Sequence, residues 1–320
     1  MLKFFNQKDG FAKIASFGRK KEPFLFIISY NKSKIYASSL KNLDSNIKYS
    51  FSNKPSNIGK KSDLKKYPVS YKKYLESFNR VIDNIKDGNT YLLNLTFKSK
   101  IETNLSLEDI FNQANAPYKL LIKDSFVCFS PECFIEIKNN TISTYPMKGT
   151  IDANILNAKE QILNNPKEMA EHTMIVDLMR NDLNIVAKET KVTNFRYIQK
   201  IKAGSKELLQ VSSKIEAKLS NKWHEHLAII LDKLTPPGSI SGTPKKKTLE
   251  IIDSVEPTKR GLYTGIFGIY DGRSLKSAVM IRAISKEHNN LFYYSGGGIT
   301  LDSNPQLEYQ ELVDKIYLPF

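Results

Sequence analysis

Four short apolar segments follow one another between residues 118 and 145, with only a few polar residues between them. They cover residues 118–122, 126–129, 134–137 and 142–145, and all contain the β-branched or aromatic side chains that favour strands. Strands joined as hairpins, without strict alternation of strand and helix, are typical of antiparallel sheets. We therefore expect an α+β fold built on large, mostly antiparallel sheets.

Helical patterns lie on both sides of these strands. Apolar side chains recur at helical spacing over residues 70–86, and Gly88 follows as the expected C-cap. Pro166 suits the first position of a helix over residues 166–183. Further helices are expected over residues 223–234, from Pro244 and from Pro305.

Other β segments are expected near both ends of the chain. Residues 24–30 and 34–39 form an expected hairpin, and the polar residues 48–66 are interpreted as a loose connection. Asp271-Gly272 favours a hairpin turn. The remaining β segments are expected over residues 91–97, 192–198, 208–215, 262–270, 275–284 and 291–295.

The formal net charge of +15 raises the alternative of a nucleic-acid-binding protein, since clustered Lys and Arg residues are typical of phosphate binding. Here the lysines are spread along the whole chain, and in the densest cluster Lys246 and Lys247 are interpreted as a solvated helix face. A positive field also favours capture of a small anionic substrate. We expect that substrate, and no nucleic-acid partner.

No apolar run approaches the roughly 20 residues that span a bilayer. Residues 1–9 lack the apolar core and the small-residue cleavage site of a signal peptide. We expect no membrane association and a cytoplasmic location.

Lys148 lies in the run TYPMKGT, residues 144–150, after an expected hairpin. Pro146 stiffens the chain and Gly149 lets the backbone come close to a ligand. An amine held out of water there would lose its proton more easily and become a nucleophile. Taken alone, a solvated surface lysine is the more common interpretation. The choice between a nucleophilic and a solvated Lys148 therefore depends on the other motifs in the sequence.

Two pairs of glutamates have helical spacing. Glu168 and Glu171 lie three residues apart on the helix that begins at Pro166, and Glu308 and Glu311 repeat this spacing on the last helix. Each pair alone is typical of a solvent-facing helix. Four carboxylates brought together would repel one another unless a cation neutralised them, and such oxygen ligands suit Mg²⁺.

Two glycine-rich segments are typical of anion-binding sites. Gly296, Gly297 and Gly298 lead into the last helix, whose first amides and dipole favour an anion. Residues 236–245 (PPGSISGTPK) combine glycines and hydroxyls before a helix, although the spacing is not that of a nucleotide-binding loop. A carboxylate is the expected guest.

The sequence resembles the chorismate-utilising enzymes, which include anthranilate, aminodeoxychorismate, isochorismate and salicylate synthases. Order and spacing of the matching blocks agree over roughly residues 70–318. The resemblance implies one large α+β fold of packed sheets with helices outside. The blocks are SPECF (130–134), PMKGT (146–150), EHTMIVDLMRND (171–182), PGSISGTPK (237–245) and the segment 296–311.

The same resemblance implies a division of the chain. Residues 1–68 would form a shortened N-terminal region that contributes strands to the same fold, and residues 69–320 the catalytic domain that binds chorismate. Longer relatives use the N-terminal region to bind tryptophan, so feedback by tryptophan is expected to be absent or altered.

Roles follow from the resemblance residue by residue. Mg²⁺, the implied cofactor, would be held by Glu171 and Glu311, with Glu168 and Glu308 nearby or acting through water, and would bind the ring carboxylate of chorismate. Glu132 matches the general acid that protonates the departing hydroxyl, a task that requires a raised pKa.

Substrate contacts are implied in the same way. Tyr263 and Arg282 match contacts to the substrate carboxylates, and the apolar run before Arg282 predicts that Arg282 is buried. The expected substrate-binding residues are Gly149, Thr150, Ser241, Tyr263, Arg282, Gly296, Gly297, Gly298 and Lys315.

Lys148 separates the members of the family. Anthranilate and salicylate synthases usually have alanine there, whereas common aminodeoxychorismate synthases have lysine. The resemblance implies that Lys148 attacks the ring and expels the hydroxyl, and that ammonia then displaces the lysine. The product would be 4-amino-4-deoxychorismate, a precursor of 4-aminobenzoate and folate. Amination with loss of pyruvate, as in anthranilate synthase component I, is the alternative.

Three further residues bear on this choice. Leu92 stands where isochorismate and salicylate synthases have a base lysine, which disfavours hydration. Gln210 replaces a histidine typical of the family, and Ser241 replaces a threonine but keeps the hydroxyl. No cysteine has the context of a glutaminase nucleophile, so we expect a separate glutamine amidotransferase subunit to deliver ammonia.

Overall fold

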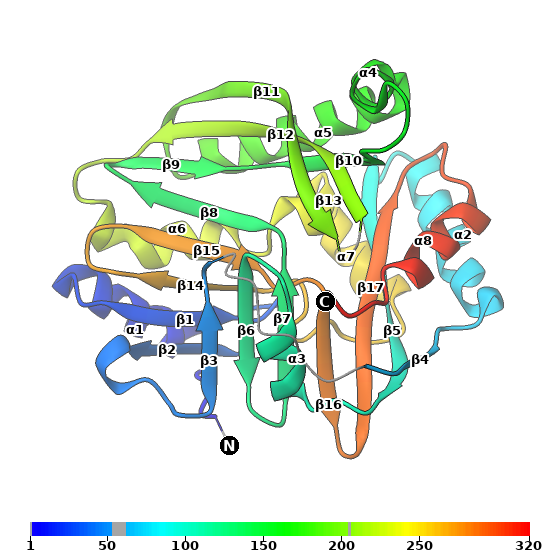
Figure 1. The fold of residues 1–320 in the computed structure, drawn as a ribbon. Helices are drawn as coiled ribbons and strands as arrows, with labels where there is room; N and C mark the ends of the chain where they lie inside the picture. The colour runs from blue at the N-terminus through cyan, green and yellow to red at the C-terminus, as the bar shows by residue number, and fades with distance from the viewer. Residues whose placement is uncertain (1, 53–61, 204–205) are drawn as a thin grey trace.

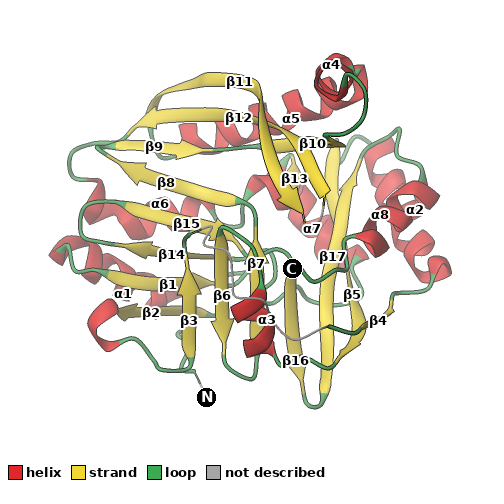
Figure 2. Ribbon diagram, in the orientation of Figure 1, coloured by secondary structure: helices red, strands yellow, loops and turns green. Residues whose placement is uncertain are grey.

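Within residues 2–52, 62–203 and 206–320, which the computed structural model describes, the strands form two large antiparallel sheets. The strands of one sheet run across the direction of those of the other (Figure 1). Helices lie around the outside of the two sheets (Figure 2). The expected α+β class is confirmed.

Sheet A brings strands from both ends of the chain side by side. β1 consists of five apolar residues, FLFII, and all five are buried because β14 and β2 pair with its two edges and both of its faces pack on apolar clusters. The pairing order is β10-β12-β9-β8-β15-β14-β1-β2, with β11 paired to β12. The bounds are β1 (Phe24–Ile28), β2 (Ile35–Ser39), β8 (Cys133–Lys138), β9 (Thr141–Thr144), β10 (Met147–Asp152), β11 (Lys188–Ala203), β12 (Lys206–Lys218), β14 (Ile266–Tyr270) and β15 (Leu275–Val279).

Sheet B has β5 and β17 as its longest pair, in which Gly297 lies opposite Leu95. The pairing order is β13-β5-β17-β16-β7-β6-β3, with β4 paired to β5. The bounds are β3 (Ile47–Ser50), β4 (Leu64–Tyr67), β5 (Leu92–Thr103), β6 (Tyr118–Ile122), β7 (Phe126–Ser130), β13 (Gly242–Thr243), β16 (Ala283–Glu287) and β17 (Asn290–Ile299).

The helices divide between the sheets. α1 packs against β2 and α6, α5 lies along β10, β11 and β12, and α8 contacts β17 and α2. The bounds are α1 (Gln7–Lys20), α2 (Tyr71–Lys86), α3 (Leu107–Gln113), α4 (Ala158–Asn164), α5 (Pro166–Asn184), α6 (Leu227–Leu234), α7 (Lys245–Val255) and α8 (Pro305–Asp314), with 3-10 turns η1 (Leu40–Asn42), η2 (Trp223–His226) and η3 (Gly238–Ile240).

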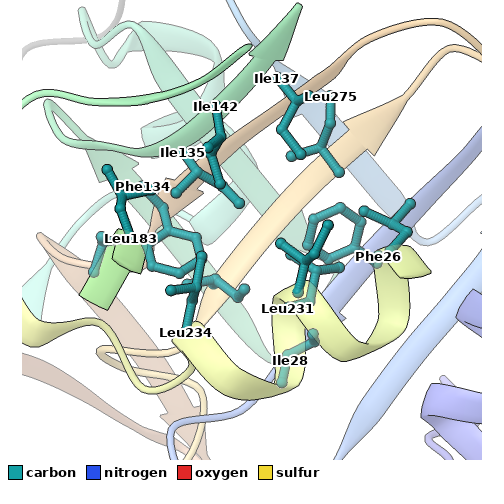
Figure 3. Close-up of a cluster of buried hydrophobic side chains, with 14 of the residues drawn as sticks. Phe26, Ile28, Phe134, Ile135, Ile137, Ile142, Leu183, Leu231, Leu234 and Leu275 are labelled. Atoms are coloured by element: carbon teal, nitrogen blue, oxygen red, sulfur yellow. The ribbon is translucent and has the colours of Figure 1, made fainter. Parts of the chain in front are cut away.

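One core cluster joins sheet A to α5 and α6. Phe26 of β1 and Phe134 of β8 meet Leu183 of α5 and Leu231 and Leu234 of α6 in this cluster (Figure 3). Burial of such apolar side chains stabilises the fold by about 1.5–3 kcal/mol each. The cluster holds α5 against the sheet and thereby fixes the helix that carries the first glutamate pair.

Of the three helices expected to begin at proline residues, two are confirmed as α5 and α8, and the third, α7, begins one residue later at Lys245 with Pro244 as its N-cap. α5 and α8 each have proline in their first turn and an asparagine cap: the side chain of Asn165 accepts from the amide of Glu168, and that of Asn304 from the amides of Gln306 and Leu307. The proline and the asparagine cap fix the first residue of each helix, and thereby the positions of the glutamate pairs that these helices carry.

The single β segment expected over residues 275–284 is wrong. β15 ends at Val279 in sheet A, and β16 begins at Ala283 in sheet B. Between them Arg282 has a φ of 51°, in the left-handed region, and the chain crosses from one sheet to the other. Arg282 is also only partly buried, because it lies at this crossing and not within a strand.

Other expectations needed smaller corrections. The helix expected from Trp223 begins as the 3-10 turn η2 and becomes α-helical at Leu227. The loose connection expected over residues 48–66 starts in β3 and ends in β4, while residues 53–61 lie outside the described residues.

Strands from the first 68 residues pair with strands from later in the chain: β1 with β14, β3 with β6 and β4 with β5. The division at residues 68 and 69 stays a prediction. Among the described residues, none of the helices is both long and apolar enough to cross a bilayer.

Candidate active site

Lys148 lies where β10 departs from regular pairing with β12. Met147 is opposite Ser212, but Thr150 is opposite Gln210, so β10 has one extra residue between these pairs. A bulge of this kind redirects side chains and is common near active sites.

Helix α5 contacts the side chain of Lys148. The Nζ of Lys148 lies 2.7 Å from Glu171 Oε2. On the same helix, Lys167 Nζ lies 3.9 Å from Glu171 Oε1. Gly149 has a φ of 95°, and a Cβ there would lie 2.9 Å from Glu168 Oε2. Glycine therefore allows the strand to approach the first glutamate pair.

Helix α8 places the second glutamate pair beside the glycine-rich end of β17. A Cβ on Gly297 would lie 3.4 Å from Glu308 Oε2 and 3.8 Å from Glu311 Oε1. Lys315 Nζ lies 2.5 Å from Glu311 Oε1 and donates a hydrogen bond to the carbonyl of Gly296 at 2.7 Å.

The two pairs act on one amine. Burial lowers the pKa of Lys148, but Glu171, Glu311 and Glu168 outweigh burial and raise this pKa above its usual value. The expectation that burial would release the Lys148 proton is wrong for this form of the protein, because the carboxylates stabilise the ammonium ion. The pKa of Glu308 is raised above its usual value, because burial and Glu311 raise it by more than Ser303 and Lys148 lower it.

Glu132, the expected general acid, lies in the turn between β7 and β8. Its Oε1 accepts a hydrogen bond from Ser239 Oγ. Burial raises the pKa of Glu132 and outweighs Ser239 and Arg282, which lower it. The raised pKa favours the protonated form that a general acid needs.

A small cavity of about 20 Å³ adjoins Glu132. Its walls include the apolar side chains of Phe134, Met179 and Leu183. A carboxyl group beside such walls is costly to ionise, which agrees with the raised pKa of Glu132.

Arg282 connects Glu132 to the cluster around Lys148. Burial lowers the pKa of Lys315, Lys315 lowers that of Glu311, and the charge of Arg282 adds to both effects. At Glu132 the charge of Arg282 opposes the raising effect of burial. Arg282 Nε is buried without a hydrogen-bond partner among the described residues, and the guanidinium carbon lies 5.4 Å from the ring centroid of Tyr317. An unpartnered guanidinium donor suits a carboxylate ligand.

Four other residues expected to contact the substrate differ in their burial and their hydrogen bonds. Tyr263 is buried, and burial raises its pKa to about 12, so its phenol is neutral. Ser241 Oγ donates to the carbonyl of Pro237 at 3.0 Å and so holds its own loop. Thr150 is exposed, and a Cβ on Gly298 would lie 3.9 Å from Leu92 Cδ1.

Four carboxylates fit a divalent cation by donor chemistry, and Glu168 Oε2 is buried without a hydrogen-bond partner in the described part of the chain. In that same part, no three potential ligands are arranged as a metal site. Glu171 is paired with Lys148, and Glu311 with Lys315.

Two neighbours of these residues were not predicted as site residues. Ser239 contacts Glu132, and the hydroxyl-rich loop at residues 236–245 was the available signal. His172 is fully buried, with Nδ1 3.3 Å from the carbonyl oxygen of Lys148. Burial lowers the pKa of His172. Its position next to Glu171, within the block EHTMIVDLMRND, was the available signal for it.

A protein family described as chorismate binding enzyme matches residues 12–319. An uncharacterized PabA-like protein of Haemophilus influenzae is 48% identical over 314 residues, which cover 95% of this chain and 94% of that protein. Aminodeoxychorismate synthase component 1 of Salmonella typhimurium is 34% identical, over 76% of this chain and 56% of that protein. Anthranilate synthase component 1 1 of Haloarcula marismortui is 33% identical, over 72% of this chain and 49% of that protein.

Among solved structures, the menaquinone-specific isochorismate synthase of Escherichia coli superposes with a TM-score of 0.74 at 16% identity, covering 98% of this chain and 82% of that chain. Identity at this level shows a shared fold alone. The sequence matches separate the chain no further than the family, since both kinds of synthase lie near one third identity.

Proposed function

The chain belongs to the family of chorismate binding enzymes, and we propose that it converts chorismate and ammonia into 4-amino-4-deoxychorismate, a precursor of 4-aminobenzoate and folate. Lys148 carries the proposal. Its amine lies at a strand bulge, 2.7 Å from Glu171. The family resemblance implies that common aminodeoxychorismate synthases have a lysine at this position.

Two substitutions at the ring account for the proposed reaction. First, the Lys148 nitrogen forms a bond to a ring carbon while the ring hydroxyl leaves as water, taking a proton from Glu132. Then ammonia bonds to the ring, and the bond to Lys148 breaks and returns the amine. Attack requires a neutral amine, so the ammonium proton must first leave Nζ, and Glu171 Oε2 is an acceptor at 2.7 Å.

Mg²⁺ is proposed as the cofactor, held by Glu171 and Glu311 with Glu168 and Glu308 nearby. When bound, the ion supplies positive charge for the ring carboxylate of chorismate. The unpartnered oxygen of Glu168 supports this assignment. Arg282, whose Nε also lacks a partner in the described residues, is proposed to bind a substrate carboxylate.

A separate glutamine amidotransferase subunit is the proposed source of ammonia. The similar synthases are named component 1, which agrees with an enzyme of more than one component. The purified chain should then use ammonium salts directly, and should use glutamine only when that subunit is added.

Anthranilate formation is the second candidate, because an anthranilate synthase component 1 is 33% identical over 72% of this chain. Lys148 favours amination without loss of pyruvate over anthranilate formation, since the family's anthranilate synthases usually have alanine at the position of Lys148. Leu92 is buried beside Gly298, which argues against a third reaction, hydration, that needs a base at this place.

Incubation of the purified protein with chorismate, Mg²⁺ and ammonium tests the proposal. Mass spectrometry should detect 4-amino-4-deoxychorismate, and addition of a lyase should convert it to 4-aminobenzoate. Anthranilate together with pyruvate would overturn the proposal in favour of the second candidate.

A further inference from the structure

The bulge in β10 removes the backbone of Lys148 from the regular ladder with β12. The ladder resumes at Thr150 opposite Gln210, one residue out of register. A carbonyl left out of a ladder has to find another donor if it is buried. For Lys148 that partner is the imidazole of His172, whose Nδ1 lies 3.3 Å from the Lys148 carbonyl oxygen.

His172 is itself fixed from its other side. Its Nε2 lies 2.7 Å from Ser213 Oγ, and its ring packs edge-on against Phe195 at a centroid distance of 5.8 Å. Both His172 and Ser213 are fully buried. Ser213 lies on β12, and its backbone amide binds the carbonyl of Pro146, two residues before Lys148.

The carbonyl of Lys148 determines the direction of this chain of hydrogen bonds. A carbonyl oxygen can only accept, so His172 Nδ1 donates its hydrogen to it at 3.3 Å. In the neutral imidazole Nε2 then carries no hydrogen and accepts from the Ser213 hydroxyl at 2.7 Å. The Ser213 oxygen in turn accepts from the amide of Arg196 at 2.9 Å.

Arg196 is held in place as well. Its guanidinium donates to the carbonyls of Leu163 at 2.6 Å and Ile162 at 2.9 Å, at the end of α4. Its φ of 51° belongs to an irregular stretch of β11. The chain of hydrogen bonds through Ser213 and His172 therefore runs from Arg196, whose side chain is fixed, to the carbonyl of Lys148.

We propose that His172, as its Nδ1–H tautomer, is a positioning residue that sets the reactive geometry of Lys148 from the backbone side. Glu171 and His172 are consecutive on α5, and they contact the amine and the carbonyl of the same lysine. Loss of the carbonyl contact frees the bulge and moves Nζ relative to the ring carbon. The kinetic part of this inference rests on the proposed amination.

The tautomer has a direct test that needs no turnover. The chain has four histidines, so nitrogen-15 spectra of the imidazoles are simple, and the signal missing from His172→Asn identifies His172. An Nδ1–H pattern is expected, and Ser213→Ala should change it. An Nε2–H pattern in the unaltered protein would overturn the proposal.

Kinetics test the positioning role. His172→Leu removes both hydrogen bonds, so kcat should fall about 10- to 100-fold with KM for chorismate unchanged, as expected for a displaced nucleophile. His172→Asn keeps an N–H donor near the Nδ1 position and should recover most of kcat. Ser213→Ala should lower kcat as well.

Ser212→Ala is the matched control. Ser212 is also fully buried on β12, but its hydroxyl donates to Gln199 at 2.9 Å and not to His172. It should leave kcat unchanged. Equal kcat in His172→Leu and the unaltered protein would overturn the inference, and so would equal losses in Ser212→Ala and Ser213→Ala.

The two proposals fail in different ways. If the unaltered protein does not aminate chorismate, the proposed function fails while the tautomer result still decides the hydrogen-bond direction. If it aminates chorismate and His172→Leu keeps its kcat, only the positioning role fails.

Discussion

Two groups of charges in this protein, one buried around Arg260 and one partly buried around Lys148, are built in opposite ways. At Arg260 all five N–H donors have acceptors: Glu256 takes two at 2.9 and 2.7 Å, and the carbonyls of Ile240 and Asn94 and the hydroxyl of Thr264 take the others. Around Lys148 the partnering is incomplete.

In that second group, Glu168 Oε2 and Arg282 Nε have no hydrogen-bond partner among the described residues. Burial and Glu311 also raise the pKa of Glu308. A group with every donor and acceptor in use stabilises the fold and has nothing left for a ligand. A group with spare donors and acceptors has capacity to bind one, which is why we place function at Lys148 and structure at Arg260.

Lys148→Ala should have the largest effect on activity. Loss of the nucleophile is expected to lower kcat by about 10³-fold or more and to abolish any covalent adduct detected by intact-protein mass spectrometry. Lys167→Ala is the control, since Lys167 is an exposed neighbour of Glu171 at 3.9 Å. A normal rate in Lys148→Ala would mean that ammonia attacks the ring directly.

Arg260→Met should have the largest effect on stability. It leaves Glu256 buried without its cation, so the free energy of unfolding should fall by about 3–5 kcal/mol in urea titrations. The double variant with Glu256→Gln should lose less than the sum of the two single changes. If Arg260→Met unfolds at the same urea concentration as the unaltered protein, the contrast between the two groups breaks down.

Removing proposed metal ligands should have an intermediate effect. In Glu171→Gln and Glu311→Gln, the Mg²⁺ concentration for half-maximal turnover should rise about ten-fold or more, since each loses a charged oxygen ligand. Glu160→Gln, on the neighbouring helix α4, is the control. Identical Mg²⁺ titrations in all four proteins would remove these glutamates from the metal site.

Ser239→Ala should have the smallest effect, a shift in pH dependence. Burial raises the pKa of Glu132, and the bond from Ser239 opposes this by stabilising the carboxylate. A general acid acts when protonated, so kcat/KM falls as pH rises through this pKa. Without Ser239 the pKa rises further, and the alkaline limb should move to higher pH. A move to lower pH, or the same shift in the control Ser254→Ala, would contradict this assignment.

Local signals in the sequence predicted the elements that carry the glutamates. The prolines at the starts of α5 and α8 act within one turn, so their effect is readable without knowing the fold. The carboxylate pairs at helical spacing are local in the same sense. Their meeting at Lys148 was inferred from a family resemblance and not from spacing.

Helix α1 was not predicted, and its glycines are the reason. Gly10 and Gly18 weaken a helical pattern. In the fold, a Cβ on Gly10 would lie 2.4 Å from Ile35 Cβ, and one on Gly18 would lie 2.2 Å from the His224 carbonyl oxygen. Both glycines allow close packing against residues distant in the sequence, which no local rule detects.

The bulge at Lys148 and its contact with His172 were missed for a related reason. Register is a property of two strands, and β12 lies far along the chain from β10. The direction of the Lys148 pKa was also missed, because the carboxylates that raise it come from two helices. Burial alone would have lowered it.

The pairing of β1 with β14 and of β5 with β17 also sets an order of events during synthesis. β1 and β5 leave the ribosome long before β14 and β17 are translated, so they cannot pair until late in synthesis. Pairing between residues so far apart in the sequence is slow. Until β14 arrives, the apolar strand β1 has an unpaired edge that favours aggregation. The charge cluster around Lys148 is completed only when α8 docks, so it is among the last features of the molecule to form.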